Sequence, residues 1–232
     1  MNLIEFQLLK SRSGVYKDTP ENRRKHRVGQ RYGVQKVDEA VEIKNYFNQK
    51  VIPNVNSFQK ASYDFANKFG IRVTPVNLKS VESVKRKILL DGTSVSKLKD
   101  LIRNTFIVEA SKLDEILFEL KGEFKVVRHK VQTPENFAGY SGHILNIEFG
   151  NGLVGEIQVN TPQMIFGKEK PEISKTLLGE ELFEKCKKSG VAPGRGHEIY
   201  ERIRVLPKTS GEAVVLIKES EKYYNEVRNI KL

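Results

Sequence analysis

Glu156 and Gln158 are the residues of this sequence whose types and spacing most directly suggest chemistry. Residues two apart in a β-strand point to the same face, so the carboxylate and the amide would project together while Ile157 and Val159 turn toward a core. A carboxylate in that position could bind a cation or take up a proton. The same alternation is typical of the solvated face of any half-exposed antiparallel strand, and the spacing alone leaves both interpretations open.

The elements that must position this pair are a β-hairpin and the loop before it. Residues 143–149 alternate apolar and polar side chains, residues 150–152 (Gly-Asn-Gly) supply a tight turn, and residues 153–159 run back. We therefore expect Glu156 to lie beside the loop that carries Tyr140 and His143.

The segment around the hairpin resembles the RelA/SpoT-type synthetase domain. Members of that family carry a Gly-Tyr-x-Ser-x-His loop, then a strand that ends Glu-Ile-Gln-(Ile/Val)-Arg-Thr, and then a helix that begins near a methionine. The corresponding residues here are Gly139-Tyr140-Ser141-Gly142-His143, Glu156-Ile157-Gln158-Val159-Asn160-Thr161 and Met164. The resemblance covers roughly residues 72–204 and implies a pyrophosphokinase, which moves the β,γ-pyrophosphate of ATP to a ribose 3′-hydroxyl.

A second segment, residues 79–87, is similar to the Lys-x-x-x-Ser-x-x-x-Lys pattern of the same family. There the resemblance implies that Lys79, Ser83 and Lys87 hold the ATP phosphates. Physical chemistry is compatible with this role, because a helix N-terminus offers free N–H groups and residues four apart lie on one helix face. A lysine-rich exposed helix would show the same spacing.

The resemblance also assigns a metal and an acceptor site. Asp100, at the head of a predicted strand, corresponds to the Asp of the family's Asp-x-x-Gly-x-Arg pattern, and together with Glu156 it would bind Mg²⁺ and form the catalytic pair. Glu156 would also help to deprotonate the attacking hydroxyl. Tyr140 would stack on the acceptor base, His143 would orient the acceptor phosphates, and Gln158 would orient the carboxylate.

Four positions depart from the family pattern. Arg103 stands where the family has Gly, and three family arginines are replaced by Asn77, Thr105 and Asn160. These departures resemble the divergent, toxin-like members of the family more than its housekeeping alarmone synthetases.

The composition of the whole chain restricts the possible functions independently of any motif. The chain of 232 residues has 40 Lys and Arg against 29 Asp and Glu, a formal net charge of +11, which favours a polyanionic partner such as nucleotides or RNA, although many lysine-rich chains are merely soluble. The single cysteine, Cys186, excludes an internal disulfide, and its lysine-rich surroundings predict an exposed helix face. No stretch reaches the ~18 to 20 apolar residues of a membrane span, so we expect a cytoplasmic protein without a membrane partner.

The patterns together predict a mixed α/β, nucleotidyltransferase-like fold. We expect a central sheet of about five strands, near Ile71, Leu101, Phe124, His143 and Leu153, flanked by helices. Residues 1–69 would form a basic, partly helical N-terminal arm with two helices broken at Pro53, and residues 70–232 the synthetase domain with C-terminal helices.

The acceptor is the least determined part of the prediction. A guanosine nucleotide, giving an alarmone, is the commonest acceptor in the family. The alternative is the 3′ end of tRNA, which toxin-like relatives modify so that translation is blocked, and which the basic cluster from Arg23 to Arg31 would suit. A toxin-like protein would also have a neutralising partner protein. A third possibility is a catalytically inactive nucleotide-binding module that has kept the fold.

Overall fold

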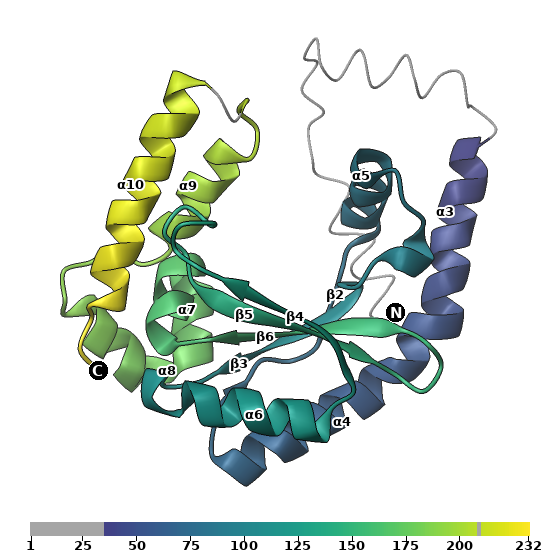
Figure 1. Ribbon diagram of the computed structural model, residues 1–232, viewed down its shortest axis with the longest axis horizontal. Helices are drawn as coiled ribbons and strands as arrows, with labels where there is room; N and C mark the ends of the chain where they lie inside the picture. Colours follow the sequence, from purple (N-terminus) through teal and green to yellow (C-terminus); the bar gives the residue numbers. More distant parts are fainter. Residues whose placement is uncertain (1–34, 208–209) are drawn as a thin grey trace.

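The computed structural model describes residues 35–207 and 210–232 (Figure 1). The basic cluster from Arg23 to Arg31, and most of the predicted N-terminal arm, lie outside these residues.

A mixed sheet forms the centre of the molecule and confirms the predicted fold class. Its strands are β1 (Arg72–Val73), β2 (Asn77–Leu78), β3 (Ile102–Ile107), β4 (Val126–Gln132), β5 (Gly142–Glu148) and β6 (Val154–Asn160). The order is β1-β3-β6-β5-β4, with β2 also paired to β3, and every pairing is antiparallel except that of β3 with β6.

The sheet has six strands where about five were predicted, because the first predicted strand is divided. Pro75 lies between β1 and β2 and has no N–H to donate to a ladder. The Thr74 N–H still reaches the Thr105 carbonyl at 2.9 Å, and the chain then rejoins β3 two residues after the proline.

The hairpin predicted around residues 150–152 is confirmed. β5 and β6 pair antiparallel from His143 opposite Val159 to Glu148 opposite Val154. Gly152 has a φ of +80°, a conformation that glycine adopts without strain, and the Asn151 Oδ1 accepts a hydrogen bond from the Leu153 N–H at 3.1 Å.

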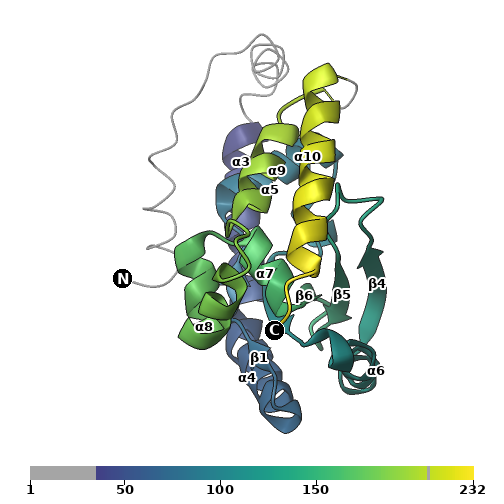
Figure 2. The same cartoon turned by 90° about the vertical axis from the view of Figure 1, so that its left-hand side faces the viewer.

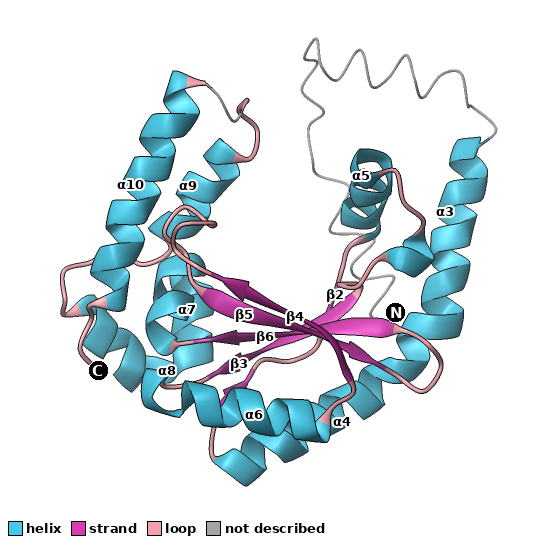
Figure 3. Cartoon of the chain, in the orientation of Figure 1, coloured by secondary structure: helices cyan, strands magenta, loops and turns pink. Residues whose placement is uncertain are grey.

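Helices surround the sheet as predicted (Figure 3). They are α3 (Gln35–Tyr46), a π-helical turn (Phe47–Val51), α4 (Ile52–Phe69), α5 (Val81–Asp91), α6 (Leu113–Glu123), α7 (Pro162–Lys168), α8 (Pro171–Lys187), α9 (Arg195–Ile203) and α10 (Gly211–Arg228), with 3₁₀ turns at Val95–Lys97 and Ala110–Lys112. The expected break at Pro53 was wrong, because α3, the π-helical turn and α4 follow one another without a gap and Val51 and Ile52 keep right-handed helical angles. The π-helical turn ends two residues before the proline, and such a local change of hydrogen bonding lets a helix continue past a residue that has no N–H.

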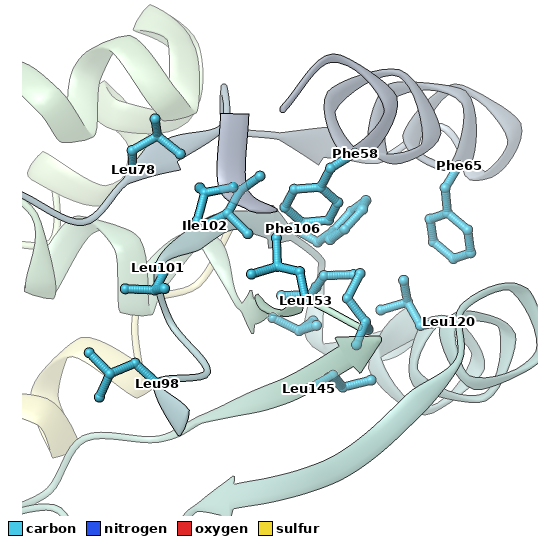
Figure 4. Close-up of a cluster of buried hydrophobic side chains, with 14 of the residues drawn as sticks. Phe58, Phe65, Leu78, Leu98, Leu101, Ile102, Phe106, Leu120, Leu145 and Leu153 are labelled. Atoms are coloured by element: carbon cyan, nitrogen blue, oxygen red, sulfur yellow. The ribbon is translucent and has the colours of Figure 1, made fainter. Parts of the chain in front are cut away.

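One face of the sheet is covered by α4 and α6, which enclose the main core (Figure 1 and Figure 4). Phe58 and Phe65 of α4 pack with Phe106 of β3, and Leu120 of α6 packs with Leu145 of β5 in the same cluster. Ile43 and Phe47, which precede α4, belong to it as well. The helices before residue 70 and the sheet after it therefore share one core within the described residues, and the division of the chain at residue 70 stays a prediction.

Cys186 is buried, so the predicted exposed helix face was wrong. It packs in a second cluster with Leu178 and Phe183 of α8, on the apolar side of a helix whose lysines point outward. Burial raises the pKa of the thiol to about 11, so the thiol stays protonated at neutral pH and is a poor nucleophile.

Two helical groups rise from the other face of the sheet. Helices α9 and α10 stand at one end and α3 and α5 at the other in Figure 1, and Figure 2 shows α7 beneath α9 and α10. None of the helices in the described part of the chain is both long enough and apolar enough to span a membrane.

Candidate active site

Glu156 and Gln158 lie on the face of the sheet opposite the main core, as the alternation predicts. Glu156 is paired with Arg103 of β3 and Asn146 of β5, and Gln158 is paired with Thr105 and Ile144. We call this surface, with Arg103, Thr105, Asn146, Glu156 and Gln158, the site face. Glu156 is only 8% exposed, and the Gln158 Nε2 donates to its Oε1 at 2.7 Å, so the amide fixes the orientation of the carboxylate.

Asp100 lies two residues before β3 and is bound by two lysines. The Lys79 and Lys87 ammonium groups donate to its Oδ2 at 2.8 and 2.9 Å. Burial alone would raise the pKa of this carboxyl, but the hydrogen bonds and charges of the two lysines outweigh burial and hold the pKa below its ordinary value. The carboxylate therefore stays ionised at neutral pH.

Asn146 ties the Asp100 segment to the site face. Its Nδ2 donates to the Lys99 carbonyl at 3.2 Å, and Asn146 is itself the β5 partner of Glu156. The backbone next to Asp100 is thus tethered beside Glu156, and the two predicted metal-binding carboxylates come from adjoining parts of the fold.

The start of α5 supplies the third predicted group. The Ser80 Oγ accepts from the Ser83 N–H at 3.3 Å and the Ser80 hydroxyl donates to the Ser83 Oγ at 3.0 Å, which caps the helix. Lys87, one turn after Ser83, points to Asp100 from the same helix. Lys79 and Lys87 therefore meet at one carboxylate, with Ser83 one turn before Lys87 on the same helix, and the N-terminus of α5 adds partial positive charge to that end of the site face.

Tyr140 lies at the opposite end of the site face, where β5 begins and β6 ends. Its hydroxyl donates to the Asn160 Oδ1, and the edge of its ring packs against Tyr224 of α10 at 5.4 Å between centroids. Burial, reinforced by the charge of Glu169, raises the pKa of Tyr140, so the phenol stays protonated. The Lys168 ammonium lies 6.0 Å from the centre of the ring.

Lys168 links the Tyr140 end to the Glu156 carboxylate. Its ammonium donates to the Gln158 Oε1 at 3.0 Å, and Gln158 in turn donates to Glu156. A chain of hydrogen bonds therefore runs from α7 across the site face to Glu156.

His143 is not brought into this group. It is paired with Val159, which is buried in the core on the opposite face from Glu156. In the family motif the histidine is four residues after the tyrosine, whereas here it is three residues after Tyr140. Because a strand alternates with a period of two, this one-residue difference turns the side chain to the other face and leaves Ile144 opposite Gln158.

On that other face His143 pairs with His129 of β4. The His129 Nε2 and His143 Nδ1 lie 3.1 Å apart, so one ring donates to the other. Burial lowers the pKa of both imidazoles, and for His143 the repulsion that would arise if His129 were also protonated lowers the pKa further. Both rings are therefore held neutral in the folded protein at neutral pH.

The donors on the site face suit Mg²⁺ only together with substrate oxygens. No group of three or more His, Cys, Asp or Glu side chains in the described residues could hold a metal. Two carboxylates, Asp100 and Glu156, are nevertheless enough for Mg²⁺, which keeps several waters and is completed by phosphate oxygens. The Asp100 Oδ1 is buried and has no hydrogen-bond partner among the described residues, which leaves it available to a cation.

Sequence reasoning did not assign roles to three residues that the structure places at the site. Asn146 and Lys168 orient their neighbours, and Asn160 holds the hydroxyl of Tyr140. Asn146 carried a signal, since it falls on the polar positions of the alternating segment 143–149. Lys168 is the last residue of α7, the helix that follows β6. Its contact with Gln158 depends on how α7 packs against the sheet, which the spacing of residues in the sequence does not predict.

One known protein to which the chain is similar is a nucleotide synthetase. No model of a protein family matches it. Over 165 residues it is 38% identical to the (p)ppApp synthetase toxin Tas1 of Pseudomonas aeruginosa, which corresponds to 70% of this chain and 37% of that protein. The chain therefore spans well under half the length of this curated relative.

Two solved structures are also similar to the chain. The crystal structure of the complex between the Type VI effector Tas1 and its immunity protein contains a chain that matches 79% of this one, over 97% of its own length, with 34% identity and a TM-score of 0.70. The small alarmone synthetase 2 of Bacillus subtilis matches 82% of this chain, over 94% of its own, with 15% identity and a TM-score of 0.46.

Proposed function

The chain belongs to the family of RelA/SpoT-type synthetases, which includes the (p)ppApp synthetase toxin Tas1, and from this we propose that it is a pyrophosphokinase acting on an adenosine nucleotide. It transfers pyrophosphate from ATP to the 3′-hydroxyl of the acceptor. The observation that carries the proposal is the geometry of the site face, where Glu156, oriented by Gln158, adjoins an Asp100 carboxylate bound by two lysines.

The donor binds at the α5 end. Lys79, Ser83 and Lys87 hold the ATP phosphates. To do so, the two lysines release Asp100 and bind phosphate oxygens instead. Asp100 and Glu156 would hold Mg²⁺, which would neutralise part of the charge of the phosphates. Once the two lysines have released Asp100, its carboxylate would be available to coordinate the cation.

The chemical step is an in-line displacement at the β-phosphorus. The acceptor 3′-oxygen forms a bond to this phosphorus, the bond from the phosphorus to the α,β-bridging oxygen breaks, and AMP leaves. Glu156 takes up the proton of the 3′-hydroxyl, and Gln158 keeps the carboxylate turned toward it. Positioning and charge neutralisation supply most of the acceleration, as expected for phosphoryl chemistry.

The acceptor binds at the Tyr140 end. Tyr140, anchored by Asn160 and Tyr224, offers an aromatic ring for stacking on a base. The buried Asn160 Nδ2 has no partner in the described residues and is a donor available to the acceptor. We do not give His143 a role here, because its side chain lies on the other face of the sheet.

An adenosine acceptor replaces the guanosine nucleotide expected from the wider family. Support comes from the named product of the Tas1 relative, together with the divergence that Thr105 and Asn160 represent. By the same relation we propose a neutralising partner protein, since Tas1 has been crystallised with its immunity protein. No described feature favours tRNA, because the basic cluster that suggested it lies outside the described residues.

The test is a transfer assay with purified protein, Mg²⁺ and ATP labelled at the β-phosphate. Adenosine and guanosine mono-, di- and triphosphates and tRNA are offered separately as acceptors, with the Glu156→Gln variant as control. We expect labelled products that carry pyrophosphate on the 3′-oxygen to be formed from adenosine nucleotides only, and to be formed at least about a hundredfold more slowly by the variant. Label on guanosine nucleotides or tRNA would correct the acceptor, and magnesium-independent nucleotide binding without transfer would identify an inactive binding module.

A further inference from the structure

Arg103 is a residue of the site face that has no role in the reaction described above. It is paired with Glu156 of β6 on one side and with Asn77 of β2 on the other. Residues paired across neighbouring strands point to the same face, so the half-buried arginine side chain lies beside the catalytic carboxylate.

The guanidinium of Arg103 forms no ion pair with any described residue. Other cations at the site are engaged, since Lys79 and Lys87 bind Asp100 and Lys168 binds Glu169. Glu156 is the adjacent anion, yet it accepts its hydrogen bond from Gln158. A half-buried guanidinium that forms no ion pair can take up an anionic ligand without first giving up a partner, as Lys79 and Lys87 would have to do.

The position of Arg103 along the strand indicates which ligand this is. Arg103 follows Asp100 by three residues and lies at the end of the site face where Lys79 and Lys87 gather. Asn160, which holds Tyr140, is paired with Ile107, so the acceptor end is about 13 Å farther along β3 at ~3.3 Å per residue.

We propose that Arg103 binds the polyphosphate of the nucleoside triphosphate donor. This inference rests on the proposed function and adds a residue that the family pattern does not predict, since that pattern has glycine at this position. Two of the three positions where the pattern has arginine flank it, with Asn77 directly across the sheet and Thr105 two residues along β3 on the same face. The Arg103 guanidinium can therefore reach the space that the family arginines would occupy, and can contact two phosphate oxygens there.

Binding of α,β-methylene-ATP with Mg²⁺, measured by calorimetry, tests the proposal without turnover. Arg103→Gln should weaken donor binding roughly ten- to a hundredfold, the usual effect of losing charge-assisted hydrogen bonds, and should raise the KM for ATP in the transfer assay. The KM for the acceptor should change by less than about threefold. Arg128→Gln, an exposed arginine on β4 three strands away, is the matched control and should bind the donor as the wild type does.

A second-site variant separates binding from folding. Adding Asn77→Arg to Arg103→Gln places a guanidinium directly across the ladder and should restore most of the donor affinity. Arg103→Lys, which keeps the charge and much of the stem, should bind the donor within roughly tenfold of wild type even if the glutamine variant does not fold. Unchanged donor binding in Arg103→Gln, or a change in acceptor KM alone, would overturn the proposal. Absence of donor binding and transfer by the wild-type protein would instead overturn the proposed function.

Discussion

Asp100→Asn removes the anion that two lysines share, and its effect on stability can be worked out from the structure. The Asp100 and Lys79 side chains are 14% and 16% exposed, whereas that of Lys87 is 37% exposed. A hydrogen bond between charged groups contributes about 1.5 to 3 kcal/mol when partly buried, so we assign about 2 kcal/mol to Lys79. Solvent screening reduces the Lys87 contact to about 1 kcal/mol or less.

Asparagine keeps one oxygen that can accept from a lysine, which recovers about 1 kcal/mol. The free energy of unfolding should therefore fall by about 2 kcal/mol at neutral pH, measured by urea denaturation. Asp64→Asn is the matched control, because it breaks an ion pair of 2.6 Å between Lys60 and Asp64 on the exposed face of α4. That variant should lose less than about 0.5 kcal/mol.

The pH dependence gives an independent check on the same ion pairs. Burial would raise the pKa of Asp100, but Lys79 and Lys87 outweigh it and lower the folded-state pKa below the ordinary 3.8. The stability that wild type gains over Asp100→Asn should therefore be fully present above about pH 5 and be lost as the pH falls through the folded-state pKa. A variant as stable as wild type at pH 7, or a difference that does not shrink in acid, would refute the reasoning.

Three further substitutions test the two faces of the sheet. Glu156→Gln should lower kcat at least about a hundredfold with little change in unfolding free energy, and equal turnover would contradict its role as base. His143→Gln should keep kcat within about threefold, because the side chain is on the core face. Since burial lowers the pKa of His143, the unfolding free energy of the wild type should fall as the pH drops below 6.5, and urea titrations of the variant should show a smaller fall. Gly142→Ala would set a Cβ 2.5 Å from the Asn160 Oδ1 and should raise the acceptor KM about tenfold. The control is Gly150→Ala, whose Cβ would meet nothing within 4 Å and should leave the acceptor KM unchanged. Equal acceptor KM values for both variants would show that the Asn160 end of the site face does not bind the acceptor.

The sequence predicted the elements of the site better than their faces. Alternation and turn residues located the hairpin, and the common face of Glu156 and Gln158 followed from a period of two. His143 was placed on the wrong side of the sheet. A motif can still be recognised when one residue is missing, but in a strand one missing residue turns the following side chains to the opposite face. Counting the residues between Tyr140 and His143 against the family motif would have given the correct face.

The remaining features could not be read from the sequence because they depend on pairings between distant segments. Nothing near Arg103 in the chain indicates that Glu156 will lie beside it, since that contact arises from the parallel pairing of β3 with β6. The burial of Cys186 depends in the same way on how α8 packs, which the flanking lysines do not reveal.

The parallel pairing of β3 with β6 also governs when the site can form during folding. Arg103 and Glu156 are neighbours across this ladder although they lie roughly fifty positions apart in the chain, and closing so long a loop is slow compared with forming the β5–β6 hairpin. Both halves of the site depend on that single closure, since Lys79, Lys87 and Asp100 come before it and Glu156 and Gln158 come after. Helices and the hairpin can therefore form in a refolding chain before the site face is complete, and a fragment that ends before β6 would keep the proposed donor-binding residues but lack the proposed base, Glu156.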